Sequence, residues 1–441
     1  MPDIESFDAA VIGAGTRGLI ATYVLSTLGY RAVLLDKAPV VGAGDGSFQL
    51  SDGTWFDFGM HVLDEMRSPL ATRLFRHVIG QRVNRVQLAR AIVLRNEIMP
   101  YAPAPAAMPE SIRALLRGDE LVDDIGDEPP TRERIGRYYG SGFADLIFDE
   151  VLPSYPTEAR HLEFGVDEAR LLVNIYPWFF PRAKRAPKHG DISREFHDRL
   201  RAGIDQHVLY PLEGGFGGFG RAFVDSYDRD RIEVVLGARD IEIAVEPGTH
   251  RIDGITALGR QFRAERYFWG SGWAELCRLF SIECQNIATD RIVLGSFRLN
   301  RPAATGFNEI LFGDPAHQIN RISFPGAFRG SDPNLLQIEF AFPEAESRSL
   351  DADEWRERWL DSLARLGLIE AGHAVEVFDF KTRPLHFNGY GMEGVPLIDA
   401  DSSRLDPASN TYPVVPSMSN LNLNAHVPRD VEYVTRVLAE S

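Results

Sequence analysis

The stretch from Asp8 to Asp36 constrains the fold more than any other part of the chain. It contains two short apolar runs, 9–12 and 32–35, and between them a helical repeat of apolar residues that begins at Leu19. Apolar runs of this length are typical of strands that are buried on both faces of a sheet. The pattern therefore predicts a strand, a tight turn, a helix and a second strand.

Three glycines in the turn fit a loop that holds a pyrophosphate. Gly13 allows a sharp turn, Gly15 lets a pyrophosphate approach the backbone, and Gly18 lets the helix pack on the strand. The helix N-terminus adds a partial positive charge. Asp36 can accept hydrogen bonds from ribose hydroxyls, which fits FAD or NAD and disfavours NADP, whose extra phosphate it would repel. The plain alternative is a glycine-rich turn in an ordinary α/β domain.

Composition limits the classes of partner. A chain of 441 residues suggests two or three folding units. With 47 Lys and Arg against 63 Asp and Glu, the net charge is −16, which disfavours nucleic acid and anionic membrane as partners. Any anionic substrate must therefore be held by local arginines. We expect no secretory signal and no integral membrane segment.

The two cysteines, Cys277 and Cys284, have a spacing that fits neither a metal clip nor a redox pair. We therefore expect no metal site, and a reducing cytoplasm is the simplest location.

The order of motifs after Asp36 resembles a flavoprotein superfamily. A glycine-rich loop from Gly42 to Gly46 precedes two expected strands, 47–50 and 54–58, and then the sequence Phe56-Asp-Phe-Gly59-Met60-His61. This resembles the superfamily of amine oxidases, protoporphyrinogen oxidases and UDP-galactopyranose mutase. A histidine two residues after the glycine resembles the mutase in particular, and in that family it lies beside the isoalloxazine ring. His61 as an ordinary core histidine remains the alternative.

Later blocks follow the same order. Tyr139-Gly140 with an aromatic helix, the Tyr155-Pro segment, and Tyr210-Pro-Leu-Glu-Gly214-Gly215 each resemble family motifs. The chain departs from the family at Gly165, where a Trp-Gly pair is expected and Phe-Gly stands. The aromatic cluster 176–181, followed by basic residues, fits either an apolar loop or a lid that grips an anion.

The second half of the chain alternates apolar and polar residues. The segments 291–299, 308–312, 319–324 and 335–342 predict an antiparallel sheet covered on one face. A helix over 351–366 is expected to pack on it through Trp355 and Trp359, and a strand over 375–381 follows. Arg321 resembles the arginine that grips the substrate diphosphate in the mutase, and alternation places it opposite Ile322. A plain surface arginine is the alternative.

The resemblance implies a fold of the α/β class. It consists of a Rossmann-like FAD-binding domain of glutathione-reductase type, which is discontinuous, and an inserted α+β substrate domain that contains the antiparallel sheet. The expected FAD-binding parts are 1–85, 206–290 and 381–441. The expected substrate-domain parts are helical over 86–205 and sheet over 291–380.

The resemblance also implies roles for individual residues. His61 and Arg321 are the catalytic candidates. The FAD-binding candidates are Gly13, Gly15, Arg17, Gly18, Asp36, Lys37, Gly42, Gly59, Met60, His61, Gly270, Asn424 and Val427. The substrate-binding candidates are Tyr155, Arg321, Arg383, Asn388 and Tyr390.

Three functions follow from the resemblance. The first is an FAD-dependent oxidoreductase that passes hydride from a small polar substrate to flavin N5. The second is a non-redox mutase acting on a nucleotide-sugar, with reduced flavin N5 as nucleophile. The third is a non-catalytic member of the fold, like the Rab GDP-dissociation inhibitors. The expected partner is a small molecule, such as a nucleotide-sugar or another anionic metabolite, and a homodimer is compatible with this fold.

Overall fold

The computed structural model describes residues 4–42, 46–65, 69–101, 108–116, 132–151, 207–282, 287–344, 346, 348–388, 408–414 and 423–440, apart from the side chains of 134, 138, 287–290, 385–388 and 423–426. The chain divides into two compact units. Unit 1 comprises Met1–Val83, Leu209–Ile287 and Val395–Ser441, and unit 2 comprises Asn84–Val208 and Ala288–Gly394.

Unit 1 is built on the predicted strand, helix and strand. Strand β1 (Ile4–Ile12), helix α1 (Thr16–Thr27) and strand β2 (Ala32–Leu35) confirm that expectation. The sheet has the order β10-β2-β1-β13-β12-β11, and β19 also pairs with β13. The other strands are β10 (Ile232–Val235), β11 (Glu242–Val245), β12 (Ile252–Ala257), β13 (Arg260–Trp269) and β19 (Thr411–Pro413).

The strands around β1 all run parallel. Strand β1 pairs with both β2 and β13, β10 pairs with β2, and β19 pairs with β13. The excursion through β11 and β12 is antiparallel. Because β1 lies between two neighbours and is covered on both faces, Ala9, Ala10 and Val11 are fully buried. The carboxyl ends of β1 and β2 therefore meet at one edge, where the glycine loop lies.

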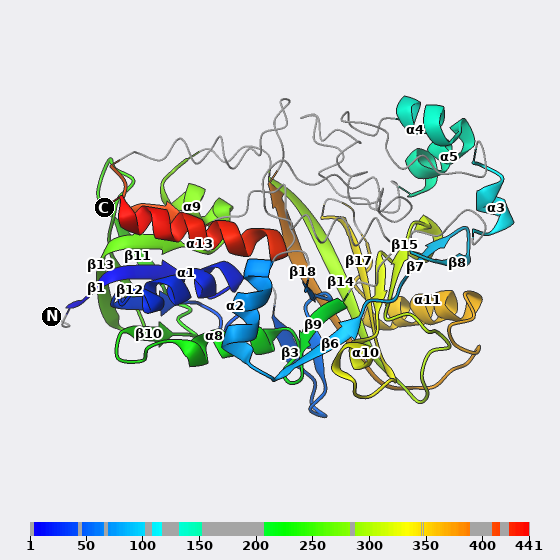
Figure 1. Cartoon of the computed structure of the whole chain (residues 1–441), viewed down its shortest axis with the longest axis horizontal. Coiled ribbons are helices and arrows are strands. Elements are labelled where there is room, and N and C mark those ends of the chain that lie inside the picture. The colour runs from blue at the N-terminus through cyan, green and yellow to red at the C-terminus, as the bar shows by residue number, and fades with distance from the viewer. Residues whose placement is uncertain are drawn as a thin grey trace. The chain divides into compact units, whose positions relative to one another are not determined.

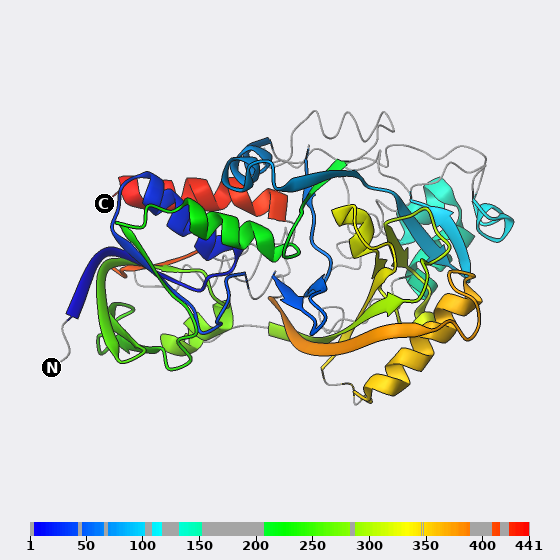
Figure 2. The same ribbon diagram turned by 90° about the horizontal axis from the view of Figure 1, so that it is seen from below.

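Helices cover both faces of this sheet. Helices α1, α2 (Pro69–Ile79), α8 (Gly217–Ser226) and α13 (Leu423–Ala439) pack on one another in a single layer, as Figures 1 and 2 show. On the other face, α9 (Trp273–Leu279) contributes Trp273 and Leu276 to a core shared with Ala10 and Ile12. No helix within the described part of the chain is long and apolar enough to cross a membrane.

Two smaller sheets contain the strands of residues 47–64, 83–87 and 207–211. Strands β3 (Ser47–Gln49) and β4 (Trp55–Asp57) form the predicted antiparallel hairpin. Strands β5 (Leu63–Asp64), β9 (His207–Pro211) and β6 (Val83–Gln87) form a three-stranded sheet in the order β5-β9-β6.

Unit 2 contains one seven-stranded sheet with the order β18-β14-β17-β16-β15-β7-β8. Its strands are β7 (Arg90–Leu94), β8 (Glu97–Pro100), β14 (Ile287–Leu299), β15 (Glu309–Phe312), β16 (Arg321–Ser323), β17 (Leu335–Pro343) and β18 (Val375–Asn388). Strand β17 pairs antiparallel with β14 and β16, β16 with β15, and β7 with β8, as expected, whereas β15 and β7 pair in parallel. The hairpin of β7 and β8 thus adds two strands to the expected sheet. The alternation of apolar and polar residues within one strand does not predict which strand will pair with it.

The longest strand also differs from its expected length. Strand β18 runs to Asn388 and not to 381. It therefore includes Arg383 and Pro384, which lie beyond the expected end of the strand.

The two faces of this sheet have different coverings. Helix α11 (Ala352–Arg365) packs on one face through Trp355, Trp359 and Leu363, as predicted (Figure 2). Gly295 makes room for it, since a Cβ there would lie 2.3 Å from the ring of Trp359. Near β7 and β8 a separate cluster is built from α3 (Glu110–Arg113), α4 (Arg132–Tyr139), α5 (Ser141–Asp145) and the π-helix η2 (Leu146–Val151). Short turns of helix occur at η7 (Pro315–His317) and α10 (Pro325–Arg329).

Candidate dinucleotide-binding site

Two of the loop glycines are required by close packing of the backbone. Gly13 has a φ of +100°, and a Cβ there would lie 2.8 Å from the amide nitrogen of Ser271. A Cβ on Gly18 would lie 1.8 Å from the carbonyl oxygen of Gly13. Gly270, which follows β13, is also closely packed, since a Cβ there would lie 3.0 Å from the amide nitrogen of Gly18. These three positions lock the start of α1 against the ends of β1 and β13.

Gly15 differs from the other two loop glycines because the space that a side chain would occupy there is open. A Cβ on Gly15 would meet no atom within 4 Å. Gly15 is the N-cap of α1, and no side chain caps this helix. An open surface beside an uncapped helix N-terminus is the arrangement in which backbone amides receive an anion. The residues present therefore fit a dinucleotide pyrophosphate.

Asp36 is held against this loop. One oxygen of its carboxylate accepts a hydrogen bond from the Ala14 amide at 2.5 Å, and the other accepts from the Ala38 amide at 2.7 Å. A carboxylate has about four lone-pair positions, so these two bonds leave it able to accept from ribose hydroxyls. Gly42, at a φ of +71°, donates its amide to the Ala14 carbonyl at 2.7 Å and so ties the next loop to the same place.

Lys37 points to solvent, with 69% of its side chain exposed. It donates to Glu275 at 2.8 Å, and this carboxylate raises the pKa of the lysine. Its role as a cofactor contact stays a prediction.

A buried carboxylate joins two of the family motifs. Asp57 is 1% exposed and accepts hydrogen bonds from the Tyr210 hydroxyl at 2.6 Å, the Ser47 hydroxyl at 2.6 Å and the Phe216 amide at 2.9 Å. Gly215, at a φ of +62°, lies so close that a Cβ would be 2.4 Å from this carboxylate. Asp57 therefore fixes the hairpin of β3 and β4 against the turn that precedes α8.

The segment after Asp57 carries the histidine candidate. Gly59 has a φ of +95°, and Met60 is buried. The imidazole of His61 is half-buried, and its centre lies 5.6 Å from the ring centre of Phe216, the N-cap of α8. His61 is thus positioned by the same turn that Asp57 organises.

Arg17 extends from the first turn of α1 toward the C-terminal helix. Its guanidinium donates to the Asp430 carboxylate at 3.1 Å, and both side chains are largely buried. Burial raises the pKa of Asp430 to about 6, although the charges of Arg17 and Arg429 lower it. Val427, on the same helix, is fully buried. Asn424 lies in α13, but its side chain is outside the described residues.

In unit 2, Arg321 is engaged by carboxylates. Its guanidinium donates twice to Glu339, at 2.9 and 2.7 Å, and once to Glu309 at 3.3 Å. Glu309 also pairs with Arg90, and despite its burial these two arginines keep the pKa of Glu309 lowered. Ile322 is fully buried on the opposite face, as alternation predicts. This geometry favours a structural role for Arg321 over a grip on a substrate diphosphate.

The remaining candidates are described only in part. Arg383 lies in β18 and is half-buried. Tyr155, Tyr390 and the aromatic cluster 176–181 lie outside the described residues, as does the side chain of Asn388. Their roles stay predictions.

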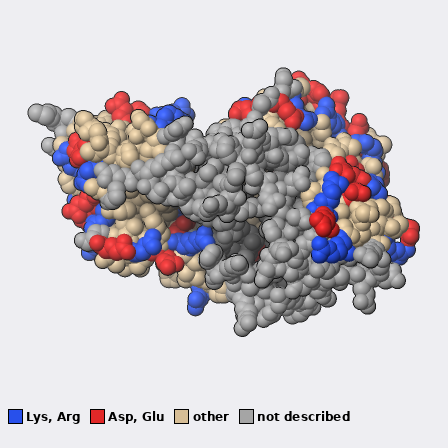
Figure 3. Space-filling view, turned by 90° about the horizontal axis from the view of Figure 1, so that it is seen from above, with Lys and Arg blue, Asp and Glu red and all other residues tan. Residues whose placement is uncertain are grey.

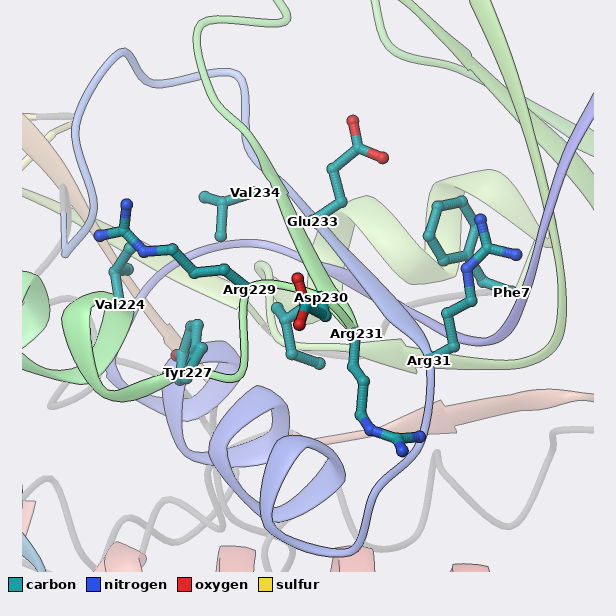
Figure 4. A pocket seen from close by; sticks show the side chains of 10 residues that line it. Phe7, Arg31, Val224, Tyr227, Arg229, Asp230, Arg231, Glu233 and Val234 are labelled. Carbon is teal, nitrogen blue, oxygen red and sulfur yellow. The ribbon is translucent and has the colours of Figure 1, made fainter.

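A second hollow lies at the opposite edge of the unit 1 sheet. It has a volume of about 470 Å³ and is lined by Phe7, Arg31, Ile232 and residues preceding β10. In Figure 4 its arginine side chains point in different directions. Arg31 lies over the ring of Phe7, and Arg231 donates to the Gly29 carbonyl. The hollow therefore does not present converging cations, and we place the candidate site at the glycine loop.

The molecular surface carries charges of both signs. In the coloured part of the face shown in Figure 3, basic and acidic residues are interspersed. No group of three or more metal-ligating side chains occurs among the described residues.

Sequence reasoning did not single out Asp57, Ser47, Tyr210 or Asp430. The motif around Asp57 offered a signal, since an aspartate between two phenylalanines and before a glycine is unusual in an apolar strand. No comparable signal marks Asp430, because its partner is 413 residues away.

Comparison with known proteins agrees with this geometry. Residues 11–78 match the NAD(P)-binding Rossmann-like domain. Prolycopene isomerase 2, a chloroplastic protein of an Oncidium hybrid cultivar, is 41% identical over 61 residues. That match spans 14% of this chain and only 10% of the relative's length.

Two solved structures are similar over the whole chain. Reduced UDP-galactopyranose mutase has a TM-score of 0.67 at 16% identity, covering 100% of this chain and 96% of its own. A putative protoporphyrinogen oxidase from Exiguobacterium sp. 255-15 has a TM-score of 0.65 at 13% identity, covering 100% of both chains.

The glycine loop lies within the segment that matches the Rossmann-like domain. The chain shares its overall fold with these two solved structures. The expected fold class and the resemblance stated from the motifs are thus confirmed at the level of fold.

Proposed function

We propose that this protein is an FAD-dependent flavoenzyme of the oxidoreductase type, which transfers hydride from a small polar substrate to flavin N5. The observation that carries the proposal is the open surface over Gly15 at the uncapped N-terminus of α1. The backbone packs tightly at Gly13 and Gly18 but leaves the surface at Gly15 open, and this contrast supports a pyrophosphate at the loop.

The chain supplies three kinds of contact to FAD. The first turn of α1 receives the pyrophosphate, because its amides and the helix dipole favour an anion there. Asp36 would accept hydrogen bonds from the ribose hydroxyls, and Arg17, which pairs with Asp430 in this structure, would add positive charge beside the pyrophosphate. When bound, FAD supplies the hydride acceptor, and the protein supplies orientation and electrostatics.

His61 is our candidate for the proton acceptor or for a group that positions the flavin. It follows Gly59 and lies against Phe216, on a segment that Asp57 anchors. Imidazole groups exchange protons near neutral pH, which suits either task.

A nucleotide-sugar mutase is the second candidate. The sequence Gly59-Met60-His61 favours it, and the mutase fold is among the similar structures. The bidentate pair between Arg321 and Glu339 counts against it, because an arginine with that partner is not available to a diphosphate without breaking a buried pair.

Anaerobic titration of the FAD-loaded protein distinguishes these functions. Amines and other small polar compounds are added in the absence of oxygen, and the visible absorption of the oxidised flavin is followed. An oxidoreductase substrate bleaches the oxidised flavin without added reductant. UDP-sugars serve as the matched second panel.

Each alternative gives a different result. A mutase converts a UDP-sugar only after prior chemical reduction and leaves the flavin reduced. A broad panel that never bleaches the flavin contradicts the first proposal. A purified protein that neither contains FAD nor takes it up supports the non-catalytic alternative.

A further inference from the structure

The ion pair between Arg17 and Asp430 joins the beginning of the cofactor loop to the end of the chain. Arg17 is the second residue of α1, and Asp430 lies in α13, which packs on α1 in the same helical layer (Figure 1). The side chains are only 13% and 7% exposed. The contact links the two helices through one guanidinium and one carboxylate, and burial of both groups offsets much of their attraction.

The carboxyl group of Asp430 is only half satisfied. One carboxylate oxygen accepts a hydrogen bond from the Arg17 guanidinium, and the other is buried with no hydrogen-bond partner. A buried carboxylate oxygen without a donor favours the protonated form, in agreement with the raised pKa of this group.

Several charged groups lie on the elements that pack against α13. They are Arg17 on α1, Arg73, Arg76 and His77 on α2, Asp64 on β5, and Arg429, Glu432 and Arg436 on α13 itself. Of these, Arg17 and Arg429 are the charges that act on Asp430, and both lower its pKa. Any rival acceptor for Arg17 therefore changes the protonation of Asp430 directly.

A dinucleotide pyrophosphate is such a rival. It would occupy the open surface at Gly15, two residues before Arg17. Its negative charges attract the guanidinium and disfavour a second anion nearby. The pyrophosphate and the Asp430 carboxylate thus compete for the Arg17 guanidinium. Protonation of Asp430 removes its negative charge and leaves the guanidinium to the pyrophosphate.

We propose that Asp430 is a positioning residue that holds Arg17 in the absence of cofactor and releases it to the pyrophosphate by taking up one proton from solvent. The inference rests on the proposed function, since it needs a dinucleotide at the glycine loop. It makes FAD binding a proton-linked event with Asp430 as the linked group.

The first test measures the FAD dissociation constant of the apoprotein, by quenching of flavin fluorescence, from about pH 6 to about pH 8. In the natural protein the constant rises with pH, by at most about tenfold per pH unit for one linked proton. In Asp430→Asn the side chain is neutral at every pH, so the constant is flat and matches the natural protein's low-pH value. Asp64→Asn, a neutralised buried carboxyl on β5, is the matched control and keeps the slope.

The second test needs no variant. Calorimetric titration of the natural protein with FAD in two buffers of different ionisation enthalpy reports the protons taken up, and we expect uptake of a fraction of one proton near neutral pH. Binding heats independent of the buffer, or an unchanged pH slope in Asp430→Asn, overturn the inference. Failure of the natural protein to bind FAD at any pH contradicts the proposed function instead.

Discussion

Replacing Asp57 by asparagine tests the connection between the β3–β4 hairpin and the turn before α8. The carboxylate accepts three hydrogen bonds while almost fully buried. Asparagine has the same shape, but it offers one acceptor oxygen and carries no charge. If that oxygen keeps Ser47 and Phe216, the new NH₂ group faces the Tyr210 hydroxyl, which formerly donated to this position.

The cost follows from these three bonds. Hydrogen bonds to charged groups contribute about 1.5–3 kcal/mol and neutral ones about 0.5–1.5, so the two retained bonds lose about 1 kcal/mol each. The mismatch at Tyr210 adds about 1–2 kcal/mol. We therefore expect Asp57→Asn to lower the free energy of unfolding by about 3 kcal/mol at neutral pH.

Two measurements check this expectation. Urea unfolding of the apoprotein, followed by far-UV circular dichroism, gives the free energy. Hydrogen exchange of peptides covering 47–58 and 207–218 reports whether the loss is local, and a change of about 3 kcal/mol corresponds to roughly a hundredfold faster exchange. Asp52→Asn in the exposed turn of the same hairpin is the control, with a change within about 0.5 kcal/mol. A loss below about 0.5 kcal/mol in Asp57→Asn would refute the assigned role.

Three further predictions follow from the site and from unit 2. Gly15→Ala should change the free energy of unfolding by no more than about 0.5 kcal/mol, and it should weaken FAD binding as measured by fluorescence titration. Gly18→Ala should lower the free energy of unfolding by about 3 kcal/mol or more, because its Cβ would overlap the Gly13 carbonyl. Equal effects of the two substitutions on stability would contradict the packing argument. Burial raises the pKa of Asp430 from the usual 3.8 to about 6, so its protonated form adds stability that is fully present below about pH 3.8 and is lost as the pH rises through about 6. By urea unfolding at about pH 3.8 and about pH 6, the natural apoprotein should lose about 2 kcal/mol relative to Asp430→Asn, and no relative loss would count against the assigned burial. Arg321→Met should lower the stability by about 3–5 kcal/mol, because it leaves Glu309 and Glu339 buried without their shared cation. Arg260→Met, in a more exposed ion-pair cluster, should lower it by about 1 kcal/mol or less. Thermal unfolding compares the two variants, and similar shifts of the melting temperature would refute the structural role of Arg321.

Much of unit 1 could be predicted because its signals are local. The apolar runs around Gly13 and the glycine spacing specify strand, turn and helix within a few residues, and the structure follows them closely. The same holds for the β3–β4 hairpin and for the tryptophan face of α11.

What could not be predicted depends on partners far apart in the sequence. The parallel pairing of β7 with β15 joins residues more than two hundred positions apart, and nothing in either strand specifies the other. Arg321 is an example at the site. Alternation placed it correctly on the face opposite Ile322, but only the register of β15, β16 and β17 shows that Glu309 and Glu339 meet its guanidinium.

The flavin content of the purified protein tests the central claim most directly. Apoprotein is mixed with excess FAD, passed through a desalting column, and assayed for flavin by absorption before and after denaturation. If the loop at Gly13, Gly15 and Gly18 holds the cofactor pyrophosphate, the protein retains one FAD per chain and releases it on unfolding, and NADP does not displace it. A protein that emerges colourless and stays so at saturating FAD would contradict the account.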